Sequence, residues 1–223
     1  MVGKTKAEAL KTKKGILDAA VDAFFEKGVA GATLDDIARI AGITRGGVYW
    51  YYKNKQEIFL AIHEKLHTSL TDEIIRLIED DPADPLGAIE RFCVDMFRRM
   101  RTDESFFKTL SIFNVKCEYS GEPAYLMEEQ NRRIEEALAY MTSVFEKAQA
   151  RGLVFGDVAP STIPIALACF IEGVVTVYLK NPKMIREQDV PQLLKMFMRG
   201  VQRDASTAQP HPSPQMNEQK ATL

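Results

Sequence analysis

Apolar residues recur every three to four positions along almost the whole chain, which is the spacing of an amphipathic α-helix. No stretch keeps the strict alternation of apolar and polar residues that marks a half-buried strand, and no internal repeat is evident. The first predicted helix ends at Gly28, a residue suited to a helix C-terminus, and its apolar face carries Ile16, Ala20, Ala23 and Phe24. The pattern therefore predicts an all-α protein.

Two short helices are expected directly after the first one. Thr33 precedes an acidic residue, Asp36, by three positions, and this spacing resembles a capping box in which Asp replaces the usual Glu or Gln. Gly42 follows, and glycine adopts the left-handed backbone conformation that a tight turn between helices needs. Thr44 then caps a helix that runs to about Tyr52. Residues 33–52 are therefore predicted to form a helix-turn-helix.

The same periodicity predicts six further helices, of which residues 160–180 form the most apolar one. Asp84 and Asp189 are expected N-caps. The limits of the six helices are marked by Lys55, Asp80-Asp81-Pro82, Asp84-Pro85, Ser120-Gly121-Glu122-Pro123, Gly152, Gly156, Asn181-Pro182 and Asp189. One of these helices is expected to carry Phe106, Leu110, Phe113 and Cys117 on one face. From about Asp204 the chain is rich in Pro, Gln, Ser and Asn, which predicts disorder.

Charge is unevenly distributed along the 223 residues, although the formal net charge is only −2. Residues 1–55 contain ten Lys and Arg against six Asp and Glu, and the rest of the chain contains 19 against 25. A basic arm is formed by Lys4, Lys6, Lys11, Lys13 and Lys14. A basic first segment suits a protein that meets phosphates, with salt-dependent affinity. A solvated tail and a chance asymmetry remain open as alternatives.

The cysteines and the apolar stretches limit the compartment and the chemistry. Cys93, Cys117 and Cys169 are widely spaced and form no C-x-x-C pair, so neither a disulfide framework nor a cysteine zinc site is expected. The charged N-terminus lacks an apolar core, so we expect no signal peptide, and the apolar run over 163–179 falls short of the roughly 20 residues that span a bilayer. We expect neither a glycine-rich phosphate loop, nor a histidine pair with metal-binding spacing, nor a Ser-His-Asp set. The expected protein is therefore cytoplasmic, is not an enzyme and has no membrane, metal or cofactor requirement.

The helix that starts at Thr44 has an unusual outer face. Ile37, Ala38 and Val48 can pack the two short helices against the first one, which leaves Thr44, Arg45, Gly46, Tyr49, Trp50 and Tyr51 on the outer surface. A helix fits the major groove of DNA, and its N-terminal residues reach base edges. Donors for phosphate oxygens are available on Thr33, Thr44, Tyr49, Lys53 and Lys55. Trp50 is equally compatible with a core position, and Tyr52 fits the core better than DNA.

The runs 33–38 and 41–55 resemble the helix-turn-helix of the tetracycline-repressor (TetR) family, because the capping residues, turn glycine, aromatic cluster and terminal lysine fall in register. Residues 4–6 and 113–119 resemble the AcrR-like branch, whose members repress multidrug efflux pumps. The family often has Tyr-Trp-His-Phe where this chain has Tyr49-Trp50-Tyr51-Tyr52. Tyr51 thus replaces a frequent phosphate-contacting His, a role that its phenol can keep.

The resemblance implies three segments: a three-helix helix-turn-helix DNA-binding domain with its basic arm at 1–55, a helical ligand-binding and dimerisation domain at 56–203, and a disordered tail at 204–223. The helix over 163–179 is apolar nearly all round, so it must be covered on both sides. With the last helix, which carries Leu193, Phe197 and Val201, it would form a four-helix seam between two subunits. A two-fold dimer would place two recognition helices roughly 34–36 Å apart.

Polar residues on apolar helix faces indicate a ligand pocket, because a few converging polar groups orient a guest in an apolar cavity. The candidate pocket residues are Leu66, His67, Phe92, Met96, Phe113, Asn114, Cys117, Gln130, Met141, Ile171 and Glu172. An ordinary core position is the alternative for each Phe and Met, and a bond across the dimer seam is the alternative for Glu172.

Together these features predict a repressor that binds a palindromic operator in double-stranded DNA as a homodimer. A hydrophobic or aromatic small molecule would release it, and its target would be a multidrug efflux pump. Two alternatives remain. One is a regulator of a catabolic or fatty-acid pathway, and the other is a helical small-molecule carrier that does not bind DNA.

Overall fold

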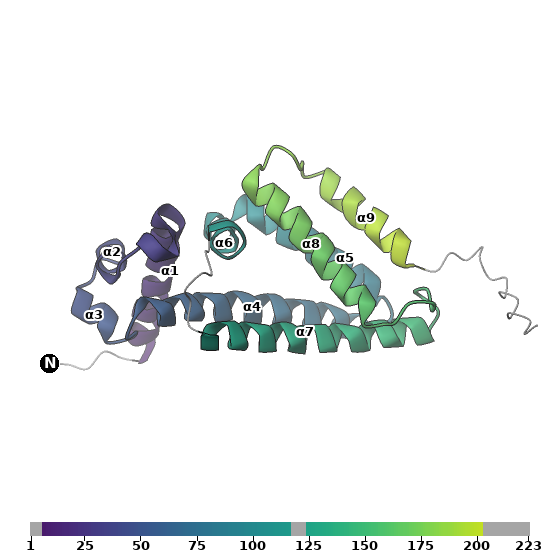
Figure 1. Ribbon diagram of the computed structural model, residues 1–223, viewed down its shortest axis with the longest axis horizontal. Helices are drawn as coiled ribbons and strands as arrows, with labels where there is room; N and C mark the ends of the chain where they lie inside the picture. The colour runs from purple at the N-terminus through teal and green to yellow at the C-terminus, as the bar shows by residue number, and fades with distance from the viewer. Residues whose placement is uncertain (1–5, 117–123, 203–223) are drawn as a thin grey trace, which may run out of the picture.

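The computed structural model describes residues 6–116 and 124–202, and within these ranges it contains nine α-helices and one π-helical turn (Figure 1). The elements are α1 (Lys6–Gly31), α2 (Leu34–Ile40), α3 (Arg45–Tyr49), α4 (Lys55–Asp80), α5 (Pro85–Thr102), α6 (Glu104–Ser111), η1 (Ile112–Lys116), α7 (Ala124–Ala150), α8 (Thr162–Lys180) and α9 (Asp189–Val201). The extended backbone pairing in these ranges is one isolated bridge between Val154 and Gln202. The predicted all-α fold is confirmed.

Side-chain caps fix the starts of the helices near the N-terminus. The Thr33 hydroxyl accepts a hydrogen bond from the Asp36 amide, and the Asp36 carboxylate accepts one from the Thr33 amide, which completes the predicted capping box. Thr44 accepts a hydrogen bond from the Gly47 amide at the start of α3. Asn54 does the same for the first turn of α4. Local sequence chemistry therefore sets where α2, α3 and α4 begin.

Three local expectations need correction. Asp189 does not cap α9, because its carboxylate accepts hydrogen bonds from the backbone amide and guanidinium of Arg186 and closes the preceding loop. The helix expected through Phe113 is α6 followed by the π turn, and Cys117 lies outside the described residues. The basic arm is helical from Lys6 onward, within α1. The tail at 204–223 also lies outside the described residues.

Two apolar cores hold the helices together. The first joins α1, α2, α3 and the start of α4, and its fully buried side chains include Ile16, Phe24, Ile37, Val48 and Phe59. The second joins α4 to α9. Since α4 contributes to both cores and runs from the N-terminal bundle into the larger part of the molecule, it connects the two parts (Figure 1).

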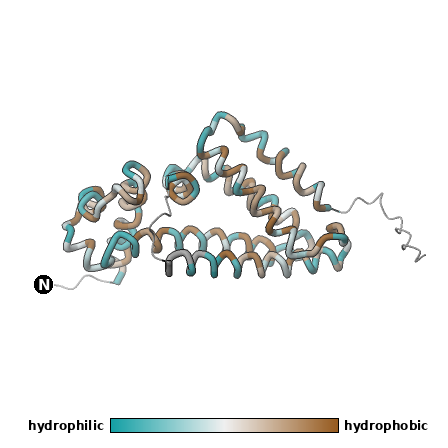
Figure 2. The backbone as a smooth tube through the Cα atoms, viewed as in Figure 1, coloured by the Kyte–Doolittle hydropathy of each residue, from teal (hydrophilic) through white to brown (hydrophobic). Residues whose placement is uncertain are grey.

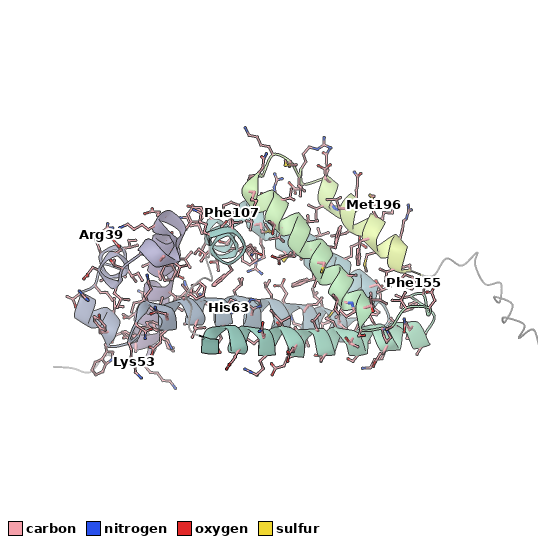
Figure 3. All side chains as sticks on the ribbon, viewed as in Figure 1. Arg39, Lys53, His63, Phe107, Phe155 and Met196 are labelled. Atoms are coloured by element: carbon pink, nitrogen blue, oxygen red, sulfur yellow. The ribbon has the colours of Figure 1, made fainter. Side chains whose placement is uncertain are left out.

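Helices α8 and α9 leave apolar surface exposed. Ile165 and Val177 on α8 and Met196 on α9 are 50%, 38% and 72% exposed. The brown segments of Figure 2 run along α8, and Figure 3 shows Met196 on the outer side of α9. By length and composition α8 could cross a membrane, but it packs against α7 and α9, and 39% of its most apolar window is buried. A core helix of a helical bundle has the same composition.

Candidate DNA-binding surface and ligand cavity

The turn between α2 and α3 has the geometry of a helix-turn-helix. Gly42 has a φ of +66°, the left-handed conformation that the sequence predicted for this turn. Ile37 and Val48 are fully buried and hold the two short helices against α1. Tyr52 is also buried, as expected of a core position. Because these inward positions are taken by the core, the remaining positions of α3 face solvent.

The exposed face of α3 is aromatic and cationic. Trp50 is 85% exposed and Tyr49 is 45% exposed, so the question of whether Trp50 lies in the core is settled in favour of the surface. The Arg45 guanidinium lies 3.0 Å from the Asp35 carboxylate and donates a hydrogen bond to the Tyr49 hydroxyl at 3.2 Å. These two contacts hold the guanidinium along the outer face of α3.

Two adjacent glycines on α3 have different surroundings. A Cβ atom at Gly46 would meet only the Thr44 hydroxyl oxygen, at 3.9 Å, so packing within the protein does not require glycine there. A Cβ atom at Gly47 would lie 3.4 Å from the same oxygen and 3.6 Å from Ile43, so Gly47 is partly required by the cap. Gly46 is therefore the position where an absent side chain leaves the backbone open to another surface.

Basic residues flank α3 on both sides. Lys53 is exposed just after α3. Figure 3 shows Lys53 and Arg39 of α2 at the end of the molecule that α2 and α3 form. The Lys55 ammonium donates hydrogen bonds to the carbonyl oxygens of Ala30 and Ala32, at 2.8 and 3.0 Å. Lys55 therefore ties the end of α1 to the start of α4, and this structural role accompanies the phosphate contact expected for it. Arg39 was not among the predicted residues, although an exposed arginine at the end of α2 was a usable signal.

A cavity of about 540 Å³ lies between α4, α5, α7 and α8. Of the predicted ligand residues, it is lined by His67, Phe92, Met141 and Ile171. Its walls are mostly apolar, and the hydrogen-bonding or charged side chains that reach it are His67, Thr68, Thr71, Asp72, Arg133, Glu136 and Tyr140. A volume of this size suits a drug-sized molecule, because ligand pockets typically span roughly 300–1,000 Å³.

Several predicted pocket residues lie elsewhere. Leu66 and Met96 are buried in the second core, and Phe113 packs against both cores without lining the cavity. The Asn114 amide donates a hydrogen bond to the Leu110 carbonyl at 2.8 Å, so it satisfies its own helix. Glu172 is exposed on α8. The side chains of Cys117 and Gln130 are outside the described part of the chain. Arg133 and Tyr140 were missed, although they lie on the same side of α7 as Ala137, which also lines the cavity.

His67, which lines the cavity, contacts a second imidazole in a tilted arrangement. The ring centroids of His63 and His67 are 4.1 Å apart (His63 is labelled in Figure 3). Burial lowers the pKa of His63 to about 3, with further lowering by His67 and Arg133. Burial and Arg133 also lower the pKa of His67. Both rings are therefore neutral near pH 7, and Arg133 pairs with Glu64 at 3.0 Å.

This histidine pair has the spacing of a metal-binding motif, His-Glu-x-x-His, at residues 63–67. The expectation that the chain has no histidine pair with metal-binding spacing is therefore wrong. In the described ranges, no third His, Cys, Asp or Glu side chain completes a metal-binding group around it. The adjacent Arg133 guanidinium also disfavours a cation at the two rings, so the pair acts as an aromatic contact.

The comparisons with known proteins agree with this geometry. A family model described as bacterial regulatory proteins, tetR family, matches residues 16–62. The chain is 30% identical to the HTH-type transcriptional regulator TtgR of Pseudomonas putida over 186 residues, which is 83% of this chain and 88% of TtgR.

Two solved structures share the fold. NalD, the secondary repressor of the MexAB-OprM multidrug efflux pump in Pseudomonas aeruginosa, is 28% identical with a TM-score of 0.76, covering 89% of this chain and all of NalD. The complex of SmeT with triclosan is 29% identical with a TM-score of 0.77, covering 92% of this chain and 99% of SmeT. Fold and surface define a helix-turn-helix transcriptional regulator. The chain belongs to the TetR family of bacterial regulatory proteins.

Proposed function

We propose that this protein is a dimeric repressor of a multidrug efflux pump that binds a palindromic operator through α3 and is released by a hydrophobic or aromatic small molecule. The observation that carries the proposal is that one helix, α4, starts six residues after the end of α3 and also lines the cavity through His67, Thr71 and Ile74. Movement of α4 on ligand binding would therefore change the position of α3. NalD and SmeT, the relatives of similar fold, support efflux control.

The proposed DNA contacts follow from the exposed face of α3. Arg45, Tyr49 and Trp50 would reach base edges or the groove floor, and the Gly46 backbone would approach the groove closely. Phosphate contacts are assigned to Thr33, Thr44, Tyr51, Lys53 and Lys55. The helix-turn-helix domain at 1–55 would carry this surface, and residues 56–203 would carry the ligand and dimer functions.

A second copy of the chain is the proposed cover for the exposed apolar surface of α8 and α9. A stable homodimer buries apolar surface of this kind, and the pairing of two α8 and two α9 helices forms a four-helix seam. The two-fold symmetry of such a dimer matches a palindromic operator with half-sites roughly 34–36 Å apart. The proposed setting is the cytoplasm, without enzymatic activity or a cofactor.

The proposed test is a mobility shift on the DNA that flanks the gene, with the purified full-length chain, at two salt concentrations, with and without triclosan as the cavity probe. A retarded complex that weakens with salt and with triclosan is expected. Triclosan binding without duplex binding would identify a small-molecule carrier instead. Release by acyl ligands or catabolic substrates but not by drugs would identify the catabolic or fatty-acid regulator.

A further inference from the structure

We propose that Phe113, on the π turn η1, is the positioning residue that couples the ligand cavity to the DNA-binding helices. The inference rests on the proposed function and adds a second path, besides α4, by which ligand binding in the cavity can affect the DNA-binding helices. In the described ranges, Phe113 is the one side chain that packs against both apolar cores. Its neighbour Ile112 is fully buried in the first core. The buried residue of that core that precedes it in the sequence is Ile62 on α4, 50 positions earlier. The π turn is therefore built into the DNA-binding bundle.

On the cavity side, the two contacting imidazoles of His67 and His63 connect the cavity to Phe113. His67 lines the cavity. Its ring contacts the His63 ring in a tilted arrangement, 4.1 Å between centroids, and the His63 ring meets the Phe113 ring edge-on at 4.9 Å. Because packed interiors have few voids, a ligand that displaces His67 must displace the rings behind it. Occupancy of the cavity is thereby transmitted to Phe113.

On the DNA side, the π turn and α6 hold α1 at Phe25. The Lys116 ammonium donates a hydrogen bond to the Phe25 carbonyl oxygen and lies 3.8 Å from the centroid of the Phe25 ring. Phe107 of α6, labelled in Figure 3, meets the same ring at 6.3 Å between centroids. Lys108 adds an ion pair to Asp22 of α1 at 2.8 Å. A shift of η1 therefore moves α1, on which α2 and α3 are packed.

Because η1 is a π turn, it has an alternative conformation available, in which its backbone hydrogen bonds are α-helical. A π turn holds one more residue per turn than an α-helix requires and occurs mostly as an isolated turn at functional sites. If η1 tightened to α-helical bonding, its last residues, Lys116 among them, would rotate by up to roughly 100° about the helix axis, the angle of one residue. Lys116 would then lose its hydrogen bond to the Phe25 carbonyl oxygen and its contact with the Phe25 ring, and η1 would be attached less firmly to α1.

The test is a thermodynamic cycle on the full-length chain. Triclosan affinity is measured by calorimetry, and operator affinity by fluorescence anisotropy with and without saturating triclosan. In the wild-type protein, triclosan is expected to weaken operator binding by roughly 5- to 150-fold, the usual range of allosteric coupling. Phe113→Leu is expected to keep both separate affinities within about threefold and to reduce the coupling factor to about a third or less.

Two further variants make the test specific. Lys116→Met changes a surface side chain, so it keeps the core intact, and it should reduce the coupling factor in the same way. Phe145→Leu removes a fully buried ring of α7 that lies outside the cavity lining and the first core, and it should leave the coupling factor unchanged. Circular dichroism verifies that each variant is folded.

The outcomes separate the two proposals. If the wild-type protein binds neither triclosan nor operator DNA, or binds both without coupling, the proposed function fails and this inference fails with it. If the wild-type protein is coupled and both Phe113→Leu and Lys116→Met remain equally coupled, this inference alone is wrong and α4 carries the signal. A loss of triclosan affinity of more than about tenfold in Phe113→Leu would also overturn it, because Phe113 would then be a ligand contact.

Discussion

Arg45 and Tyr49 lie one turn apart on the outer face of α3, and the Arg45 guanidinium donates a hydrogen bond to the Tyr49 hydroxyl at 3.2 Å. The guanidinium also lies 5.5 Å from the centre of the Tyr49 ring. A flexible arginine is thus held in one direction before DNA arrives, and less conformational entropy is lost on binding.

Tyr49→Phe is predicted to weaken operator binding by about 2- to 10-fold, which corresponds to the roughly 0.5–1.5 kcal/mol of one hydrogen bond. The free energy of unfolding should change by less than about 0.5 kcal/mol, because the pair is at the surface. Anisotropy with a labelled operator and urea denaturation measure the two quantities. An unchanged operator affinity would mean that the Arg45 orientation is irrelevant to binding.

Gly46→Ala separates helix stability from DNA binding. The added methyl group meets only the Thr44 hydroxyl, so α3 should be more stable by up to about 1 kcal/mol, the difference between Ala and Gly in a helix. Operator affinity should nevertheless fall by about tenfold or more, because the methyl group stands between the helix and the groove.

The matched control for Gly46→Ala is Gly31→Ala at the end of α1, where a Cβ atom has only an ordinary contact, 3.9 Å from the Cβ of Lys27. This variant should leave operator affinity unchanged. If Gly46→Ala also binds the operator with wild-type affinity, close approach of the α3 backbone to DNA is excluded.

Tyr52→Phe tests a buried hydroxyl. Within the described part of the chain, the Tyr52 hydroxyl is buried without a hydrogen-bond partner, and burial raises the pKa of this phenol to about 12. An unsatisfied buried polar group costs about 1–3 kcal/mol, so its removal should raise the free energy of unfolding by about 1 kcal/mol. Operator affinity should not change. A clear loss of stability in chemical denaturation would show that the hydroxyl has a partner.

The His63–His67 pair predicts a pH-dependent stability. The pKa of His63 in the folded protein, about 3, lies below the ordinary value of 6.5, so the unfolded chain binds more protons between these pH values. The corresponding stability is complete above pH 6.5 and is lost as the pH falls toward 3, by at most about 1.4 kcal/mol per pH unit.

His63→Gln removes one of these titrating groups, while His67, Arg133 and Glu64 remain around the site. Urea denaturation at pH 7.5 and pH 5.5 should show a smaller loss of stability in this variant than in the wild-type protein. An equal loss in both would indicate that the His63 ring is already solvated in the folded state.

The features that the sequence predicted well depend on neighbours in the chain. The capping box of Thr33 and Asp36, the cap at Thr44 and the left-handed Gly42 each involve residues within a few positions of one another. The periodic apolar pattern likewise predicts helices wherever one face is buried. Such local chemistry is readable without knowing how the helices pack.

The features that the sequence did not predict depend on packing between distant helices. Periodicity places Leu66 and His67 side by side but does not say which of them faces the cavity, and only His67 does. The exposure of Trp50 depends on which face of α3 packs against α2 and the first core. The π turn at Ile112–Lys116 has no compositional signal, because its residues also suit an α-helix.

The central claim, that the outer face of α3 binds an operator, is tested most directly by the affinity of the double variant Arg45→Ala/Tyr49→Ala for operator DNA. Arg91→Ala, an exposed arginine of α5 that pairs with Asp81 and Asp84, is the control for loss of surface charge. The account predicts that the double variant loses about 100-fold or more in affinity, since each base-edge contact contributes roughly 1–3 kcal/mol, while Arg91→Ala binds like the wild-type protein. Wild-type operator affinity in a folded double variant would contradict it.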